Sequence, residues 1–161
     1  MSPSSGASGG PATIRALQAA LTAENTAVYG YGVAGARLSG ARRAAAVRDW
    51  VAHENARDAL TAMLTARGGQ PVAAAAAYAL PFSVRNAPAA VSLAAVLEDR
   101  VAAVYLGLVA LSEPSLRAFG AAGVRTAALR AAAWRGSTLA FPGFEVTPSS
   151  TPRTAARANG S

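Results

Sequence analysis

The feature that most constrains the fold is a stretch without proline between residues 12 and 38, in which one set of mostly apolar residues recurs at spacings of four and three. These positions are Leu17, Leu21, Glu24, Val28, Tyr31, Gly35 and Leu38. Such spacing places them along one face of a single α-helix. The pattern predicts a helix from about Pro11 to Leu38, with Glu24 inside an apolar seam where a carboxylate needs a partner.

The same spacing recurs in three later segments, and it predicts helices over about 41–67, 88–111 and 113–135. Ser112 ahead of Glu113 and Pro114 is a typical N-terminal signal for the last of these. No segment shows the alternation typical of a strand. Residues 68–87 hold two prolines and are long enough to run back along a bundle. Two tight hairpins joined by a long crossover indicate an all-α, ferritin-like four-helix bundle.

Polar residues interrupt the predicted seams at one height of the bundle. The best apolar phase of the second helix comprises Ala46, Trp50, His53, Arg57, Leu60 and Leu64, and the third helix has Glu98 and Tyr105 on the flank of its apolar face. Matching levels across the hairpins places Glu24, His53 and Glu98 together. The predicted polar cluster comprises Glu24, His53, Arg57 and Glu98, with Glu54, Asp58, Arg125 and Arg130 as neighbours.

Several segments resemble a known family. They are LQAALTAENTAVYGYGVAGARL, AHENARDAL, QPVAAAAAYALPFSV, LEDRVAAVYLGLV and the closing Trp134 with FPG. Over roughly residues 12–144 they are similar to alanine-rich actinobacterial ferritin-like proteins of unknown function. The resemblance implies a ferritin-like fold and no established activity. The chain departs from the usual His-Arg-x-Arg-Arg-Asp pattern, because Glu54 and Asn55 follow His53.

A standard di-iron centre cannot be assembled from this sequence. Such a centre takes a glutamate from each of two helices and a Glu-x-x-His from each of the other two. The chain has one histidine, and Trp50 stands three residues before it. The fourth helix, residues 115–135, contains no Asp, Glu or His. A reduced site remains an alternative, in which Glu24, His53 and Glu98 hold a single iron, manganese or zinc ion as part of a mononuclear oxidoreductase.

The leading interpretation of the cluster needs no cofactor. In it Glu24 pairs with Arg57, and Glu98 meets Arg100 or an arginine of the fourth helix, since arginine satisfies carboxylates and repels a metal cation. Tyr29, Tyr31 and Tyr105 are interpreted as packing residues rather than radical relays. The glycines at 30, 32 and 35 are interpreted as sites of close helix packing.

The charge balance opens a third interpretation. Fifteen basic residues, all arginine, face eight acidic ones, which gives a net charge of +7. A predicted basic surface at one end of the first hairpin comprises Arg37, Arg42, Arg43 and Arg48, and Arg153 and Arg157 lie near the C-terminus. An arginine-mediated nucleic-acid binder is therefore an alternative, although a solvated basic end is the favoured interpretation.

The remaining expectations concern organisation and location. The predicted division is a tail over 1–11, a bundle over 12–144 whose FPGF segment packs back on its end, and a second tail over 145–161. The chain has no cysteine, which excludes disulfides and thiolate metal sites. It shows neither a leader pattern nor an apolar run of about 18 residues, so a cytoplasmic protein without a membrane partner is expected. The favoured function is a non-catalytic structural or interaction module that forms a dimer.

Overall fold

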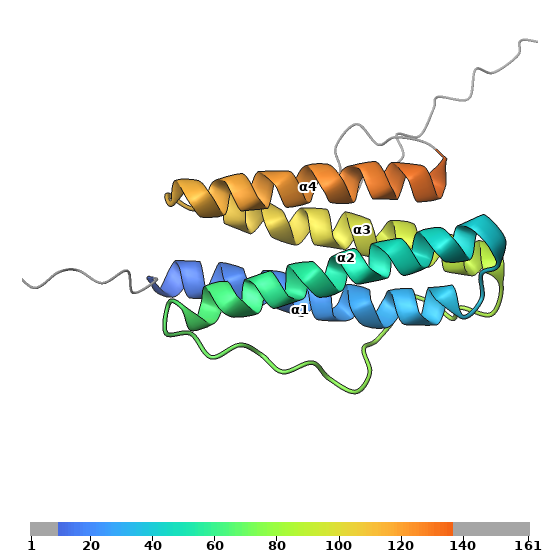
Figure 1. Cartoon of the computed structure of the whole chain (residues 1–161), viewed down its shortest axis with the longest axis horizontal. Coiled ribbons are helices and arrows are strands. Elements are labelled where there is room, and N and C mark those ends of the chain that lie inside the picture. The colour runs from blue at the N-terminus through green and yellow to red at the C-terminus, as the bar shows by residue number, and fades with distance from the viewer. Residues whose placement is uncertain (1–9, 137–161) are drawn as a thin grey trace, which may run out of the picture.

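The computed structural model describes residues 10–136, which form four α-helices and, within that range, no strand. The helices are α1 (Pro11–Gly35), α2 (Gly40–Thr65), α3 (Ala87–Val109) and α4 (Pro114–Arg135). Two antiparallel hairpins, α1 with α2 and α3 with α4, lie side by side, and residues 66–86 run back along the bundle to join them (Figure 1). The predicted all-α four-helix bundle is confirmed.

The helix boundaries differ from the predicted ones by a few residues. The first helix ends at Gly35 rather than Leu38, because two tight turns follow it and α2 begins at Gly40 with a positive φ of 53°. The N-cap of α4 is Glu113 rather than Ser112. The predicted tails and the FPGF segment lie almost wholly outside the described residues.

Glycines bring two pairs of helices close together. A Cβ on Gly30 would lie 2.5 Å from Leu97 Cδ1, and a Cβ on Gly123 would lie 2.1 Å from Tyr105 Cδ1. These residues therefore allow α1 to approach α3 and α4 to approach α3. The prediction that Gly32 and Gly35 also serve close packing is wrong, because a Cβ at either position would meet nothing within 4 Å.

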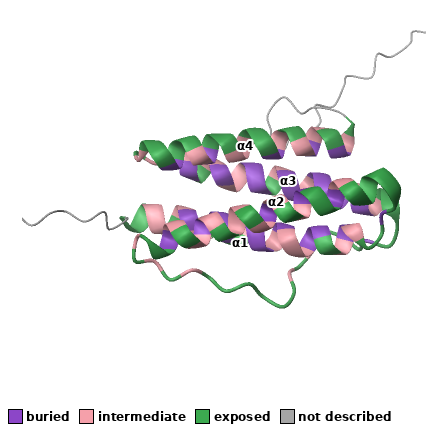
Figure 2. Ribbon diagram, viewed as in Figure 1, coloured by how far each residue is buried: buried purple, intermediate pink, exposed green. Residues whose placement is uncertain are grey.

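The core consists of two apolar clusters with a polar group at their junction. One cluster centres on Leu17, Leu21, Leu60, Leu64 and Leu108, and the other on Tyr31, Leu38, Leu93, Leu97 and Trp134. The buried residues line the inward sides of the helices (Figure 2). Among the described helices, none combines the length and hydropathy that crossing a bilayer requires.

Two details of the predicted core are wrong. Glu98 and Tyr105 lie in the core with exposures of 0% and 2%, not on the flank of α3. On α2 Asp49 is buried beside His53 at the polar level, whereas Trp50, which the predicted face included, is half-buried. Both errors have one cause, because the α2 and α3 faces that turn inward carry acids at positions that an apolar pattern does not select.

Candidate functional site

The centre of the polar group is His53 on α2, which is 1% exposed and lies between two carboxylates. Its Nδ1 lies 2.6 Å from Glu24 Oε2 of α1, and its Nε2 lies 3.1 Å from Glu98 Oε1 of α3. Both glutamates are buried. The structure thus brings together the three residues at the centre of the predicted cluster, and it places one carboxylate on each ring nitrogen.

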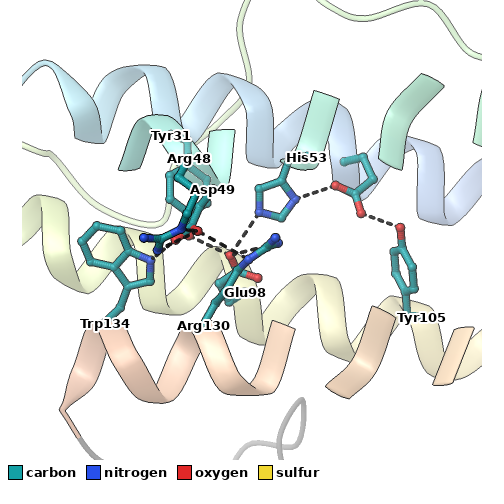
Figure 3. Close-up of polar contacts among 9 residues, drawn as sticks. Tyr31, Arg48, Asp49, His53, Glu98, Tyr105, Arg130 and Trp134 are labelled. Atoms are coloured by element: carbon teal, nitrogen blue, oxygen red, sulfur yellow. Dashed lines mark hydrogen bonds and ion pairs between the residues drawn. The ribbon is translucent and has the colours of Figure 1, made fainter. Parts of the chain in front are cut away.

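Two tyrosine hydroxyls extend this arrangement into a chain that runs along the interior of the bundle (Figure 3). Tyr105 of α3 donates to Glu24 Oε1 at 2.5 Å, and Tyr31 of α1 donates to Glu98 Oε1 at 2.7 Å. The resulting order is Tyr105, Glu24, His53, Glu98, Tyr31, which we call the central chain. Hydrogen bonds that end on carboxylates therefore tie three helices together in the interior of the bundle.

The electrostatics of the central chain favour a protonated histidine. Burial alone lowers the pKa of His53, but hydrogen bonds to Glu24 and Glu98 and the charges of both carboxylates outweigh it, and raise the pKa from 6.5 to about 9. An imidazolium at neutral pH can donate from both nitrogens. Burial, followed by the charge and hydrogen bond of the adjacent glutamate, raises the pKa of Tyr31 and of Tyr105 well above its ordinary value, so both phenols remain neutral donors.

A third buried carboxylate, Asp49, links α2 to α4 next to the central chain. It accepts a hydrogen bond from Trp134 Nε1 at 3.0 Å and pairs with Arg130 Nε at 3.5 Å and with Arg48 NH2 at 3.1 Å. Arg42 stacks over the Trp134 ring at 5.5 Å. Sequence reasoning missed Asp49 and the role of Trp134. The available signal was spacing, because Asp49 precedes His53 by one helical turn and shares its face.

The arginines predicted in the cluster divide into one that reaches it and two that do not. Arg130 approaches Glu98 Oε1 at 4.0 Å, as a partner from the fourth helix. The expected pairing of Arg57 with Glu24 is wrong, because Arg57 binds Asp58 at 2.9 Å and Glu54 at 3.7 Å.

The other predicted residues lie on the surface. Arg125 and Arg100 are exposed, as are the four arginines of the predicted basic surface. Tyr29 packs against Tyr78 of the crossover at 5.9 Å between ring centroids, away from the central chain. The tyrosines thus divide into one packing residue and two hydrogen-bond donors.

The ligand set proposed for a metal does not match this geometry. Glu24 and Glu98 lie on opposite sides of the imidazole, one at each nitrogen, so the three side chains do not converge on one point. Within residues 10–136, no group of three or more His, Cys, Asp or Glu is placed to hold a metal ion. Glu98 Oε2 is the one carboxylate oxygen of the central chain that is buried without a hydrogen-bond partner.

Comparisons with known proteins place this bundle in a family. The family model described as "Domain of unknown function (DUF4439)" matches residues 16–146. The chain belongs to the DUF4439 family. The DUF4439 fold of this chain also resembles the crystal structure of a conserved hypothetical protein, rv2844, from Mycobacterium tuberculosis, with 30% identity and a TM-score of 0.76 over 79% of this chain and 97% of the other. Comparison with functionally curated proteins found no match. The ferritin-like relationship and the actinobacterial origin stay predictions.

Proposed function

We propose that this DUF4439 protein is a non-catalytic structural or interaction module, in which charged side chains occupy the place that metal ions take in a ferritin-like bundle. The observation that carries the proposal is the occupation of both His53 nitrogens by carboxylates at 2.6 and 3.1 Å. A ring with both nitrogens engaged as donors has no lone pair left for a metal.

Charge balance supports the same proposal. Three buried carboxylates, Glu24, Glu98 and Asp49, carry three negative charges. The His53 imidazolium and the guanidinium of Arg130 supply two positive charges from inside the bundle, and Arg48 supplies a third from its surface. Cations of the protein itself can thus neutralise these carboxylates in place of a bound metal.

The test combines metal analysis with stability. Untagged protein is reconstituted with iron, manganese and zinc, and bound metal is measured by elemental mass spectrometry. We expect no stoichiometric metal. Glu24→Gln should lower the free energy of unfolding by about 3 kcal/mol, because it leaves buried donors without a full set of acceptors.

Glu54→Gln is the matched control for the stability measurement. Glu54 is a partly exposed glutamate whose contact with Arg57 is 3.7 Å long, so its replacement should change stability by less than about 0.5 kcal/mol. One metal per chain that is lost on His53→Ala would support the mononuclear oxidoreductase instead. Equal stability losses in Glu24→Gln and Glu54→Gln would show that Glu24 has no special structural role.

Self-association is the second part of the proposed function. Val47 and Val51, one turn apart on α2, are 51% and 43% exposed, and Leu129 on α4 is 66% exposed. Exposed aliphatic side chains of this kind are typical of contact surfaces when they adjoin. We expect a dimer in sedimentation velocity that dissociates in Val47→Glu, whereas a wild-type monomer at high concentration would rule the dimer out.

A further inference from the structure

We propose that one end of the bundle binds the phosphate backbone of nucleic acid. This basic end is where α1 finishes and where α2 and α3 begin, as seen in the fold (Figure 1). Its exposed basic residues are Arg37, Arg42, Arg43, Arg48 and Arg85. The proposal depends on their distribution and does not depend on the function proposed above.

The decisive observation is where the carboxylates lie. On α2 the first carboxylates that reach solvent are the partly exposed Glu54 and the exposed Asp58, about 21 and 27 Å along the helix from Gly40 at its usual rise per residue. Asp49 is nearer but 2% exposed, and it is engaged from inside by Trp134. The described part of the basic end therefore carries no exposed carboxylate.

Three arginines elsewhere in the bundle are neutralised by neighbours. Arg57 binds Glu54 and Asp58. Arg67 pairs with Glu113 at 2.5 Å, and a bidentate pair at 2.7 and 3.0 Å joins Arg135 to Asp99. By contrast Arg37, Arg43 and Arg85 form no ion pair within residues 10–136. Arg15, Arg100, Arg117 and Arg125 also form no ion pair there, but they are distributed over α1, α3 and α4. The basic end differs because its five exposed arginines lie on adjoining segments without an exposed carboxylate among them.

Two arginines of the basic end are held in place by the protein. Arg42 stacks over Trp134 at 5.5 Å and donates to the Ala133 carbonyl oxygen at 3.4 Å. Arg48 pairs with Asp49 at 3.1 Å while its side chain stays 71% exposed. A guanidinium that is fixed before binding loses less conformational entropy when it meets a phosphate.

Nucleic acid fits this surface better than a membrane does. The group consists of guanidinium ions, which bind phosphate oxygens bidentately. A membrane-surface helix would need a broad exposed apolar face beside its charges, whereas the large exposed apolar side chains of α2 are two valines, Val47 and Val51. With Arg48 already paired, about four phosphate contacts are available, which predicts a salt dependence with a slope near −4 on logarithmic axes.

The experiment measures binding of the full-length protein to a labelled DNA duplex of about 20 base pairs by fluorescence anisotropy, between about 50 and 200 mM salt. The wild type should lose about 100-fold in affinity over that range. A triple variant Arg37→Ala, Arg43→Ala and Arg85→Ala should bind far more weakly and lose only about 3- to 4-fold, as expected for one remaining contact.

The matched control removes the same charge from elsewhere. Its substitutions are Arg15→Ala, Arg117→Ala and Arg125→Ala, at exposed positions that form no ion pair within the described chain. It should retain most of the wild-type affinity and salt slope, and both triple variants should keep the wild-type melting temperature. Equal losses in the two variants would mean that only net charge matters. That result, absence of binding at low salt, or binding to anionic vesicles without binding to DNA would overturn the proposal.

Discussion

Raising the pH should destabilise this protein through one residue, His53. Its pKa is raised from 6.5 in the unfolded chain to about 9 in the fold, because Glu24 and Glu98 stabilise the imidazolium more than burial destabilises it. A group whose pKa rises on folding contributes stability that is fully present below the unfolded value and is lost as pH passes the folded value. The shift corresponds to about 3 kcal/mol at 1.36 kcal/mol per unit.

The loss should therefore develop between about pH 6.5 and 9. Urea unfolding followed by circular dichroism at several pH values measures it directly, and the corresponding fall in melting temperature is about 10 °C for a domain of this size. His53→Gln, which cannot titrate, should show a flat profile over the same range.

If His53→Gln does not fold, a direct titration of the wild-type protein measures the pKa of His53 instead. The chain has a single histidine, so its ring resonances are unambiguous in NMR spectra. They should titrate near pH 9. A transition near 6.5, or a wild-type stability that stays constant from pH 6.5 to 9, would refute the argument that two carboxylates hold the proton.

Two further predictions concern packing and the link between α2 and α4. Gly123→Ala should destabilise by about 1 to 3 kcal/mol, because the new methyl group would overlap the Tyr105 ring, whereas Gly32→Ala, where a Cβ meets nothing within 4 Å, should stabilise α1 by up to about 1 kcal/mol; thermal melts of the pair test this. Trp134→Phe should cost about 1 to 3 kcal/mol in urea unfolding, because Asp49 loses a buried donor at 3.0 Å, and an unchanged midpoint would argue against that bond.

The meeting of Glu24, His53 and Glu98 could be predicted from sequence, because helical spacing indicates which face of a helix a residue occupies and how far along the bundle it lies. Glu24 falls in the α1 seam, and level matching within the hairpin brings it to His53. Level matching across the other helices brings Glu98 and Arg130 to the same height. Spacing does not fix the rotation of a helix about its axis to within one residue, so the prediction that Glu98 lies on the flank of α3 is wrong.

Two of the charged partners could not be predicted because they depend on side-chain reach. Arg57 lies near the level of Glu24, but carboxylates on its own helix, Asp58 and Glu54, lie closer to its guanidinium and leave it partly in water. Asp49 shares a face with His53, yet two of its partners, Trp134 and Arg130, come from α4, far along the sequence. Spacing rules describe one helix at a time, whereas the contacts of Asp49 with α4 depend on the relative rotation of two helices.

The two glutamates of the central chain should respond differently to the same substitution. Glu24 accepts on both oxygens, from Tyr105 at 2.5 Å and from His53 at 2.6 Å. A glutamine there must turn its amide nitrogen toward one of these donors, so that the amide N–H group points at the Tyr105 hydroxyl or the His53 N–H group. At Glu98, Tyr31 and His53 share Oε1, while Oε2 is buried without a partner. Glutamine can keep its oxygen at the shared position and place the nitrogen where no donor stands.

Both substitutions remove one buried negative charge, so their difference isolates hydrogen-bond geometry. Glu98→Gln should therefore cost at least about 1 kcal/mol less than Glu24→Gln in urea unfolding at pH 6, where His53 is protonated in the wild type. Equal costs would mean that charge alone governs the chain. A larger cost at Glu98 would show that its lone oxygen has a partner, such as a buried water, that the amide displaces.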